Sequence, residues 1–145
     1  PAKTRIREAR TPERQTPNSE TMNIEDFRSY CLSFEGAYEK MPFGKATSEY
    51  DRNLLVFYVA GKWFCFINID EFDFCNIKCD TERIDDLRER YEGIGPGYDM
   101  NKKHWISVRF DKDVPEETIH DLVERSYEIV VGSLSKKEKE ALRAL

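Results

Sequence analysis

Residues 54–69 read LLVFYVAGKWFCFINI and contain two runs of strand-forming side chains, Leu54–Val59 and Trp63–Ile69. The two runs are joined through Ala60–Lys62, and the middle residue of this connection, Gly61, can adopt a positive φ. An antiparallel hairpin is therefore the natural connection. Both runs are apolar on both faces near their middles. Helices can cover one face, and a chain segment or a partner must then cover the other.

The residues before the hairpin predict one helix and one short strand. Asn23 is a favourable helix N-cap, and the apolar side chains that follow it recur at helical spacing. These side chains are Ile24, Phe27, Cys31 and Phe34. We expect this helix to end near Gly36, because glycine is favoured just past a helix C-terminus. Met41–Gly44 reads as a loop, and Ala46–Tyr50 is expected to form a short strand.

The residues after the hairpin alternate between strands and helices. We expect Asp73–Cys79 to be a third strand, Gly93–Gly97 an irregular loop and Trp105–Phe110 a strand of alternating character. Further helices are expected to start at Asp80 or Thr81, at Asp113 and Pro115, and at a capping box beginning with Ser135. Hairpin-linked strands interrupted by helices predict an α+β fold of two layers, a mostly antiparallel β-sheet with helices packed on one face.

Length and charge set limits on the domain organisation. The 145 residues suit a single domain, which we place at residues 22–145. Residues 1–21 are poor in apolar side chains and more basic than acidic, so we expect a flexible basic N-terminal tail. The formal net charge of the chain is -5. This charge argues against a protein that coats nucleic acid by bulk charge, but it permits a local basic patch.

The sequence shows no sign of a secretory or membrane segment. It has no signal-like apolar region at its start, and no apolar run approaches the roughly 20 residues that a membrane helix needs. We therefore expect a cytoplasmic protein with no membrane contact and with reduced thiols. Among the four cysteines, Cys75 and Cys79 do not have the spacing of a zinc-binding pair. Buried thiols are the favoured interpretation, and neither a metal nor a cofactor is expected.

Side chains that can contact a ligand gather just before the alternating strand. This candidate site consists of Asn101, Lys102, Lys103, His104 and Trp105. In a functional interpretation the lysines contact phosphate, Asn101 hydrogen-bonds a base or a backbone group, and Trp105 stacks. In a structural interpretation Trp105 is a core residue, His104 is a polar neighbour, and Asn101 bonds its own backbone in a turn.

Two further cations are candidates for the same site. Arg109 is expected on the same strand face as Trp105, where it would extend the patch. Lys78 shares a strand face with Phe74 and Asn76. It either reaches the patch or is a surface cation whose stem covers apolar surface.

The sequence does not predict an enzyme. His104 titrates near neutrality and is a candidate acid or base, but no Ser-His-Asp order and no pair of metal-binding histidines accompanies it. Gly93–Gly97 is glycine-rich but lacks the Gly-Lys-Ser/Thr ending of a nucleotide phosphate loop. His120 belongs to an amphipathic helix beside Asp121 and Glu124, so we expect it at the surface.

Five segments of the chain together form a recognisable pattern. They are Asn23–Leu32, Pro42–Gly44, Lys78–Asp80, Pro96–Trp105 and Ser126–Tyr127. In content and order they resemble the MmcQ/YjbR family, whose hallmark of asparagine, lysine, any residue, histidine and tryptophan is similar to Asn101–Trp105. The resemblance covers Met22 to about Leu134. It implies a compact CyaY-like, or secretion-chaperone-like, α+β domain, and members are commonly described as predicted DNA-binding proteins.

Three functions follow as hypotheses. The first is a small non-catalytic module that binds DNA or RNA through the strip from Asn101 to Arg109, helped by the basic tail. The alternative is a protein–protein interaction module or homodimer, because some strands carry more apolar surface than one helix layer is expected to cover. The aromatic residues of these strands are Phe57, Trp63, Phe64 and Phe66. The third is an enzyme with His104 as acid or base.

Overall fold

The computed structural model describes residues 22–145, and the expected tail, residues 1–21, lies outside the described residues. The elements follow in the order α2 (Ile24–Leu32), β1 (Tyr38–Lys40), α3 (Glu49–Arg52), β2 (Leu54–Val59), β3 (Lys62–Asn68), β4 (Phe74–Lys78), α4 (Thr81–Arg90), β5 (Ile94–Pro96), β6 (Trp105–Arg109), α5 (Glu116–Gly132) and α6 (Lys136–Arg143). Among the helices of residues 22–145, none combines the length and apolar character that a membrane crossing requires.

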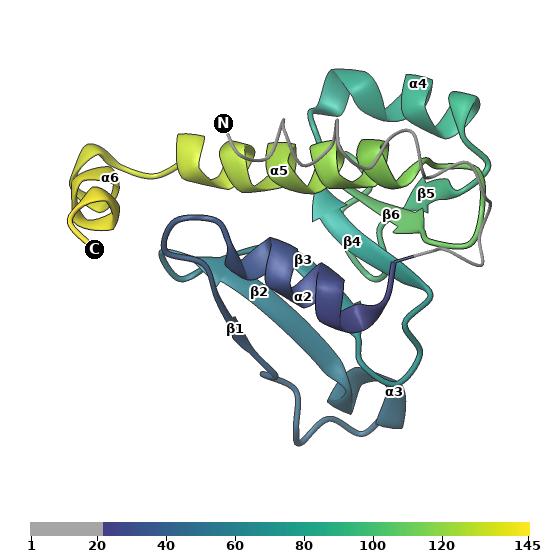
Figure 1. Ribbon diagram of the computed structural model, residues 1–145, viewed down its shortest axis with the longest axis horizontal. Coiled ribbons are helices and arrows are strands. Elements are labelled where there is room, and N and C mark those ends of the chain that lie inside the picture. Colours follow the sequence, from purple (N-terminus) through teal and green to yellow (C-terminus); the bar gives the residue numbers. More distant parts are fainter. Residues whose placement is uncertain (1–21) are drawn as a thin grey trace.

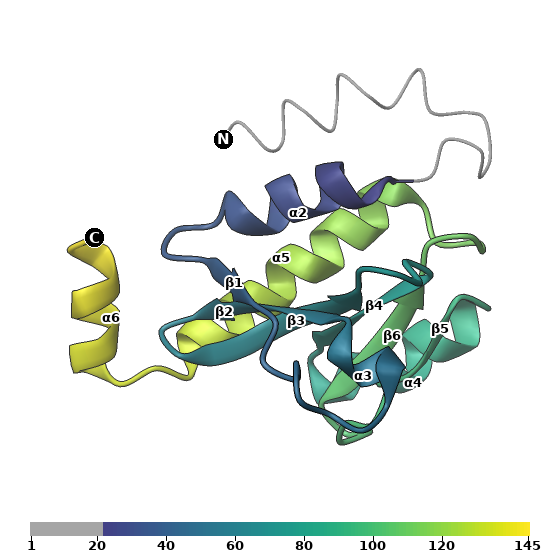
Figure 2. The same ribbon diagram turned by 90° about the horizontal axis from the view of Figure 1, so that it is seen from below.

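The strands of the described region form one six-stranded sheet in the order β1-β2-β3-β4-β6-β5 (Figure 1). Every neighbouring pair is antiparallel. Helices α2, α4 and α5 contribute buried side chains to the larger hydrophobic cluster. Figure 2 shows α2 and α5 on one side of the sheet and α3 on the other. The predicted α+β class, with a mostly antiparallel sheet, is confirmed; the main helices α2 and α5 share one face, and the short helix α3 is the exception.

The central hairpin forms as its sequence predicts. Val59 pairs with Lys62, which leaves Ala60 and Gly61 as a two-residue connection. Both residues have positive φ, 51° for Ala60 and 79° for Gly61. Two consecutive positive φ angles match the twist of an antiparallel pair of strands, so the hairpin closes without splaying.

The first strand lies earlier in the chain than the sequence indicates. Residues 46–50 were expected to form a strand, but Glu49–Arg52 is the short helix α3, capped by the side chain of Ser48. The strand is instead Tyr38–Lys40, which pairs with β2 and stacks Tyr38 on Tyr58. A three-residue edge strand is too short to show a hydrophobic period, so only its pairing partner identifies it.

The glycine-rich segment after α4 is also a strand. Gly93–Gly97 was expected to be an irregular loop, but Ile94–Pro96 forms the edge strand β5 and pairs with β6. Proline cannot donate to a ladder, and an edge position tolerates this because only one side of the strand is paired. The prediction was wrong because the glycine and proline content of the segment is typical of a loop, whereas pairing with β6 stabilises a strand.

The second face of the sheet is covered by the chain itself. A smaller hydrophobic cluster there consists of Leu54, Val56, Tyr58, Phe66 and Trp105, and the side chains of Phe43, Tyr50, Trp63 and Met100 pack against it. These covering residues come from the loop before α3, from α3, from β3 and from the loop before β6. A chain segment therefore covers this face, which was one of the two possibilities left open.

The apolar surface expected for a protein partner does not exist at the predicted residues. Phe57, Phe64 and Phe66 are buried inside the two clusters, and only Trp63 is partly exposed. Phe57 and Phe64 lie under the helix layer, and Phe66 lies in the cluster on the second face. The strands therefore carry apolar surface beyond what the helix layer covers, as expected, but loops and α3 of the same chain cover it, so these residues do not support a protein partner.

The core contains groups whose placement the sequence predicted only in part. All four cysteines are buried free thiols, as the favoured interpretation required. His120, expected at the surface, is buried instead, and its ring centroid lies 4.2 Å from that of Tyr30. The hydroxyl of Tyr30 also donates to the backbone carbonyl of His120 at 2.9 Å. These contacts between α2 and α5 hold His120 in the core.

Candidate functional site

The turn before β6, Gly97–His104, is tied to the sheet and to α3 near its start. The backbone N–H of Tyr98 donates to Oδ1 of Asn76 at 2.7 Å. The hydroxyl of the same tyrosine donates to Oδ1 of Asp51 at 3.1 Å. Asn76 is a buried residue of β4, so the turn has a fixed position against the second face of the sheet.

Asn101 holds the second half of this turn together. Its backbone carbonyl accepts hydrogen bonds from the N–H groups of His104 and Trp105. Its side-chain Oδ1 accepts from the N–H of Lys103 at 2.7 Å, which is an Asx-type turn. The carbonyl of Lys103 in turn accepts from the hydroxyl of Thr81 at 2.8 Å. Asn101 therefore acts on the local backbone, as the structural interpretation of this residue states.

Lys102 and Lys103 present charge from this fixed turn. Both residues are exposed, and neither side chain forms an ion pair with any residue in the range 22–145. Several arginines differ in this respect: Arg28 pairs with Glu39, Arg109 with Asp111 and Arg125 with Asp80. Unpaired ammonium groups remain available for an external anion.

His104 contacts Thr81, the first residue of α4. Its Nδ1 is 3.3 Å from the hydroxyl of Thr81, and its carbonyl accepts from the N–H of Cys79 at 2.8 Å. The residue itself is exposed. These contacts join the end of the turn to the junction between β4 and α4, which is a positioning role.

Trp105 is not a surface platform. The residue is 6% exposed and packs against Phe66, with ring centroids 5.9 Å apart. It lies in the smaller hydrophobic cluster because its strand position faces the covered side of the sheet. The interpretation in which this indole stacks freely on a base is therefore wrong, since the ring is needed to fill the core.

Lys78 lies directly beside Trp105. The two residues are cross-strand partners at the end of β4 and the start of β6. The β3–β4 ladder has already ended here, because its last pair is Cys65 with Ile77. Lys78 thus belongs to the same face as the turn, and the prediction that it shares this face with Asn76 holds.

A buried hydroxyl bridges the place where β3 and β4 separate. The Oγ of Ser126, on α5, accepts from the N–H of Lys78 at 2.8 Å and donates to the carbonyl of Phe64 at 2.5 Å. Phe64 and Lys78 would be the next residues to face each other in a continuing ladder. The serine side chain replaces the missing strand-to-strand bond, so the strands diverge without leaving polar groups unpaired.

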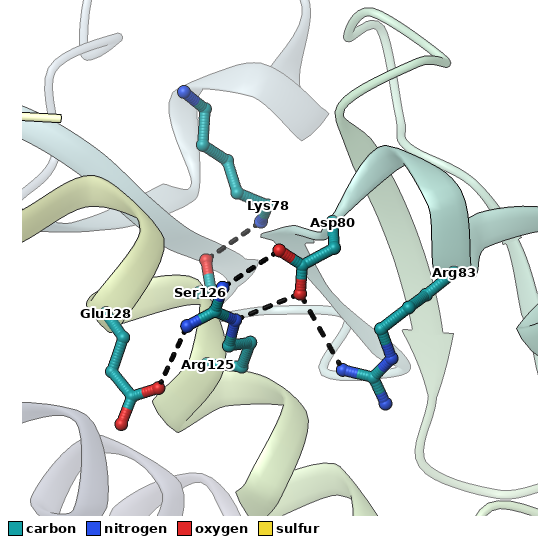
Figure 3. Close-up of polar contacts among 6 residues, drawn as sticks. All are labelled: Lys78, Asp80, Arg83, Arg125, Ser126 and Glu128. Atoms are coloured by element: carbon teal, nitrogen blue, oxygen red, sulfur yellow. Dashed lines mark hydrogen bonds and ion pairs between the residues drawn. The ribbon is translucent and has the colours of Figure 1, made fainter. Parts of the chain in front are cut away.

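The backbone after Lys78 is fixed to α5 by an ion-pair cluster (Figure 3). Arg125 donates to both carboxylate oxygens of Asp80 at 2.9 Å, and it also pairs with Glu128. These bonds from Arg125 hold the pKa of Asp80 below its usual value. Figure 3 shows the Lys78 side chain extending away from this cluster, so its ammonium group is not used there.

The separation of the strands coincides with a pocket of about 390 Å³. Its lining residues are Lys62, Trp63, Lys78, Met100, Trp105, Val130 and Ser133. They come from the start of β3, the end of β4, the turn before β6, the start of β6, the last turn of α5 and its C-cap residue Ser133. Two of the lining residues are lysines and two are tryptophans, the only two tryptophans in the chain.

Arg109 does not belong to this group. It lies four residues along β6 from Trp105, a distance of about 13 Å at the usual rise of a strand. Its Nε is paired with Oδ1 of Asp111 at 3.1 Å. Strand alternation places Arg109 on the same face as Trp105, as predicted. The two residues nevertheless lie at opposite ends of β6, so Arg109 does not extend the patch.

The pocket includes residues that the sequence did not mark as candidates. Trp63 was noted for its apolar surface and Met100 only as part of the segment Pro96–Trp105, while Lys62, Val130 and Ser133 were not marked as site residues. They converge from several elements, and no local motif encodes such a convergence. The one available signal was the placement of each tryptophan next to the end of a predicted strand.

Comparisons with known proteins agree with the motifs. The model of the YjbR family matches residues 32–129. The uncharacterized protein YbdF of Escherichia coli O157:H7 is 32% identical over 105 residues, which span 72% of this chain and 86% of YbdF. The uncharacterized protein YjbR of Escherichia coli K12 is 25% identical over 122 residues, which span 83% of this chain and 98% of YjbR.

A solved structure supports the same relationship at the level of the fold. The crystal structure of Deinococcus radiodurans protein DR2400 superposes with a TM-score of 0.75 at 31% sequence identity. The match covers 88% of this chain and 91% of DR2400. The motif order, the family match and the shared fold coincide over most of the domain. This chain therefore belongs to the YjbR family.

Proposed function

We propose that this protein binds nucleic acid, without catalysis, through the lysines in and beside the turn Gly97–His104. One observation carries the proposal: Lys102 and Lys103 are exposed and unpaired with any residue of the described range, on a turn whose backbone is hydrogen-bonded in place. Ammonium groups on a fixed turn contact phosphate as point charges and set the position of a ligand.

Lys78 adds a third cation on the same side of the sheet. It is the cross-strand neighbour of Trp105, which ends the turn. Its side chain points away from the Asp80–Arg125 cluster, so this charge is not consumed by the nearby carboxylate (Figure 3). Three lysines on one side of the sheet form a local basic patch on a protein that is negative as a whole.

The overall charge sets the character of this binding. A chain with a formal net charge of -5 repels a polyanion over most of its surface. Contacts are then confined to the patch, and affinity depends strongly on salt because each phosphate contact releases counterions. We expect weak binding that disappears at high ionic strength.

The composition of the pocket favours binding over catalysis. Among the pocket-lining residues, all within 22–145, there is no carboxylate, imidazole or thiol. Those are the groups that most often act as general acids, bases or nucleophiles. His104 is not one of the lining residues. The cytoplasmic location, the CyaY-like assignment and a role for residues 1–21 stay predictions from the sequence.

A salt-titrated binding assay tests the proposal. Fluorescence anisotropy with labelled duplex DNA, single-stranded DNA and RNA should show affinity that falls linearly with salt on logarithmic axes. The double variant Lys102→Glu with Lys103→Glu should lose measurable binding, since two attractive contacts become repulsive. Replacing one contacting lysine by glutamine should reduce the salt slope by about 1.

A matched double variant separates the patch from total charge. Lys45 and Lys112 are exposed lysines outside the turn and outside the pocket lining. Lys45→Glu with Lys112→Glu changes the net charge by the same amount and should weaken binding far less. Equal losses in the two double variants, or tight binding in the Lys102 and Lys103 variant, would refute the proposed site.

A further inference from the structure

We infer that the pocket between β3 and β4 binds one nucleotide unit, a flat aromatic ring that carries a phosphate. The inference extends the proposed function by naming the ligand of this pocket. It rests on the proposed function for a nucleotide that is part of a nucleic-acid strand. Four features of the pocket lead to this ligand: its aromatic wall, its ammonium groups, its size and its position beside the lysine turn.

The aromatic wall is provided mainly by Trp63. This indole is partly exposed, and edge-to-face contacts with Phe43 and Phe66 fix its plane, with ring centroids 5.7 Å apart in both cases. Met100 and the covered indole of Trp105 complete the apolar lining. A rigid, partly exposed indole is a suitable surface for a base, because every base has a flat π face.

The charge of the lining residues favours an anionic ligand. Lys62 and Lys78 both line the pocket, and no carboxylate does, among the described residues. Outside the pocket, Lys62 lies near Glu138, whose pKa is lowered first by the backbone N–H of Ser135 and to a smaller extent by Lys62. Lys78 has no such partner in the described range and is the stronger candidate for the phosphate.

Size limits the ligand to one unit. Pockets for small molecules usually measure about 300–1,000 Å³, and this pocket, at about 390 Å³, is near the lower end. It has room for one ring with its sugar and phosphate, but not for a stack of several bases. A double helix cannot use it, because paired bases are stacked inside the duplex.

The position of the pocket connects it to the basic turn. Met100 and Trp105 both line the pocket, and the segment between them contains Lys102 and Lys103. A nucleic-acid strand whose phosphates contact these lysines would therefore pass the pocket. One unpaired base can then enter it, so single-stranded nucleic acid is the form that we expect to bind.

Intrinsic fluorescence reports occupancy directly, since both tryptophans of the chain line the pocket. We expect adenosine monophosphate to quench this emission in a saturable way, and deoxyribose 5-phosphate, which lacks the ring, to have little effect. Lys78→Gln should weaken the mononucleotide several-fold. Lys112→Gln, which removes an exposed lysine elsewhere, should leave it unchanged.

Strand binding is tested with two oligonucleotides of equal length and charge. A single-stranded oligonucleotide should bind on the order of 10-fold more tightly than its abasic counterpart, since stacking of one base has about this value. In the Trp63→Leu variant the two oligonucleotides should bind with equal affinity, and the abasic oligonucleotide should bind as it does to the unchanged protein. Lys78→Gln provides the independent variant if Trp63→Leu fails to fold.

Each result decides between the two proposals. Equal binding of the base-bearing and abasic strands, still dependent on Lys102 and Lys103, overturns the pocket inference and leaves the proposed function in place. Saturable binding of the mononucleotide without any strand binding supports the pocket and identifies free nucleotides as the source, while it refutes the nucleic-acid function. If neither the mononucleotide nor the oligonucleotide binds, both proposals are refuted.

Discussion

The hydroxyl of Ser126 decides how two strands of the sheet separate. It is fully buried, and it joins the N–H of Lys78 on β4 to the carbonyl of Phe64 on β3. Helical periodicity predicts that Ser126 faces the core, but not that it replaces a bond of the sheet. A small hydroxyl that both donates and accepts fits this position, because one group satisfies both strands where they separate.

Ser126→Ala should destabilise the protein by about 1–3 kcal/mol, because it leaves a buried N–H and a buried carbonyl without partners. Urea denaturation followed by circular dichroism measures the change. Ser33→Ala is the matched control: its hydroxyl donates to the carbonyl of Tyr30 at an exposed helix end, and its loss should change stability by less than about 0.5 kcal/mol. Similar effects of the two substitutions would contradict the bridging role.

At the scale of elements, the turn Gly97–His104 connects the sheet, the pocket and the exposed lysines. It covers the second face of the sheet through Met100, supports the pocket, and presents Lys102 and Lys103. Close packing fixes its first residue: a Cβ atom on Gly97 would lie 2.8 Å from Cβ of Trp105. The family hallmark in this turn thus combines a residue that builds the turn, Asn101, with an exposed lysine, Lys102.

Gly97→Ala should destabilise the protein by about 1–3 kcal/mol and shift the tryptophan emission, because the added methyl group displaces Trp105. Gly95→Ala, in the adjacent edge strand β5, is the control. A Cβ there would meet Oγ of Ser107 at 3.5 Å, an ordinary contact, so both stability and emission should change little. Denaturation and emission spectra of the two variants test this. An unchanged spectrum in Gly97→Ala would show that the turn is not packed as described.

At the scale of the whole molecule, the two layers meet at a cluster of thiols. Cys31 on α2, Cys65 on β3 and Cys75 on β4 are completely buried, and burial raises the pKa of each thiol above its usual value. The thiols of Cys31 and Cys75 also interact with that of Cys65. A helix and two central strands must separate before a reagent can reach this cluster.

We therefore expect a thiol reagent at pH 8 to label the three clustered cysteines only as fast as the whole domain unfolds. Cys79, which is 5% exposed and lies just beyond β4, should react before them. Mass spectrometry of labelled peptides at increasing urea concentration measures the order. In Cys79→Ser the early phase should disappear. Rapid labelling of Cys65 or Cys75 in native protein would mean that the layers open locally.

The sequence by itself determined the two-layer α+β class, the central hairpin and the buried stripes of the helices. Each of these depends on a local period or on a turn residue such as Gly61, so the neighbouring residues contain the information. It also indicated the Asn101–Trp105 turn and Lys78 as candidates. The sequence left two interpretations of Trp105 open, and its burial agrees with the structural one. Strand alternation shows which side a residue faces, but not whether that side is covered.

Only the tertiary structure decided where β1 and β5 lie, how the second face is covered and where the pocket forms. The edge strands are three residues long, and pairing with β2 and β6 stabilises them more than their own composition does. The pocket joins residues from Lys62 to Ser133 that become neighbours only when β3 and β4 diverge around Ser126. Such long-range contacts depend on packing, and no local pattern in the chain encodes them.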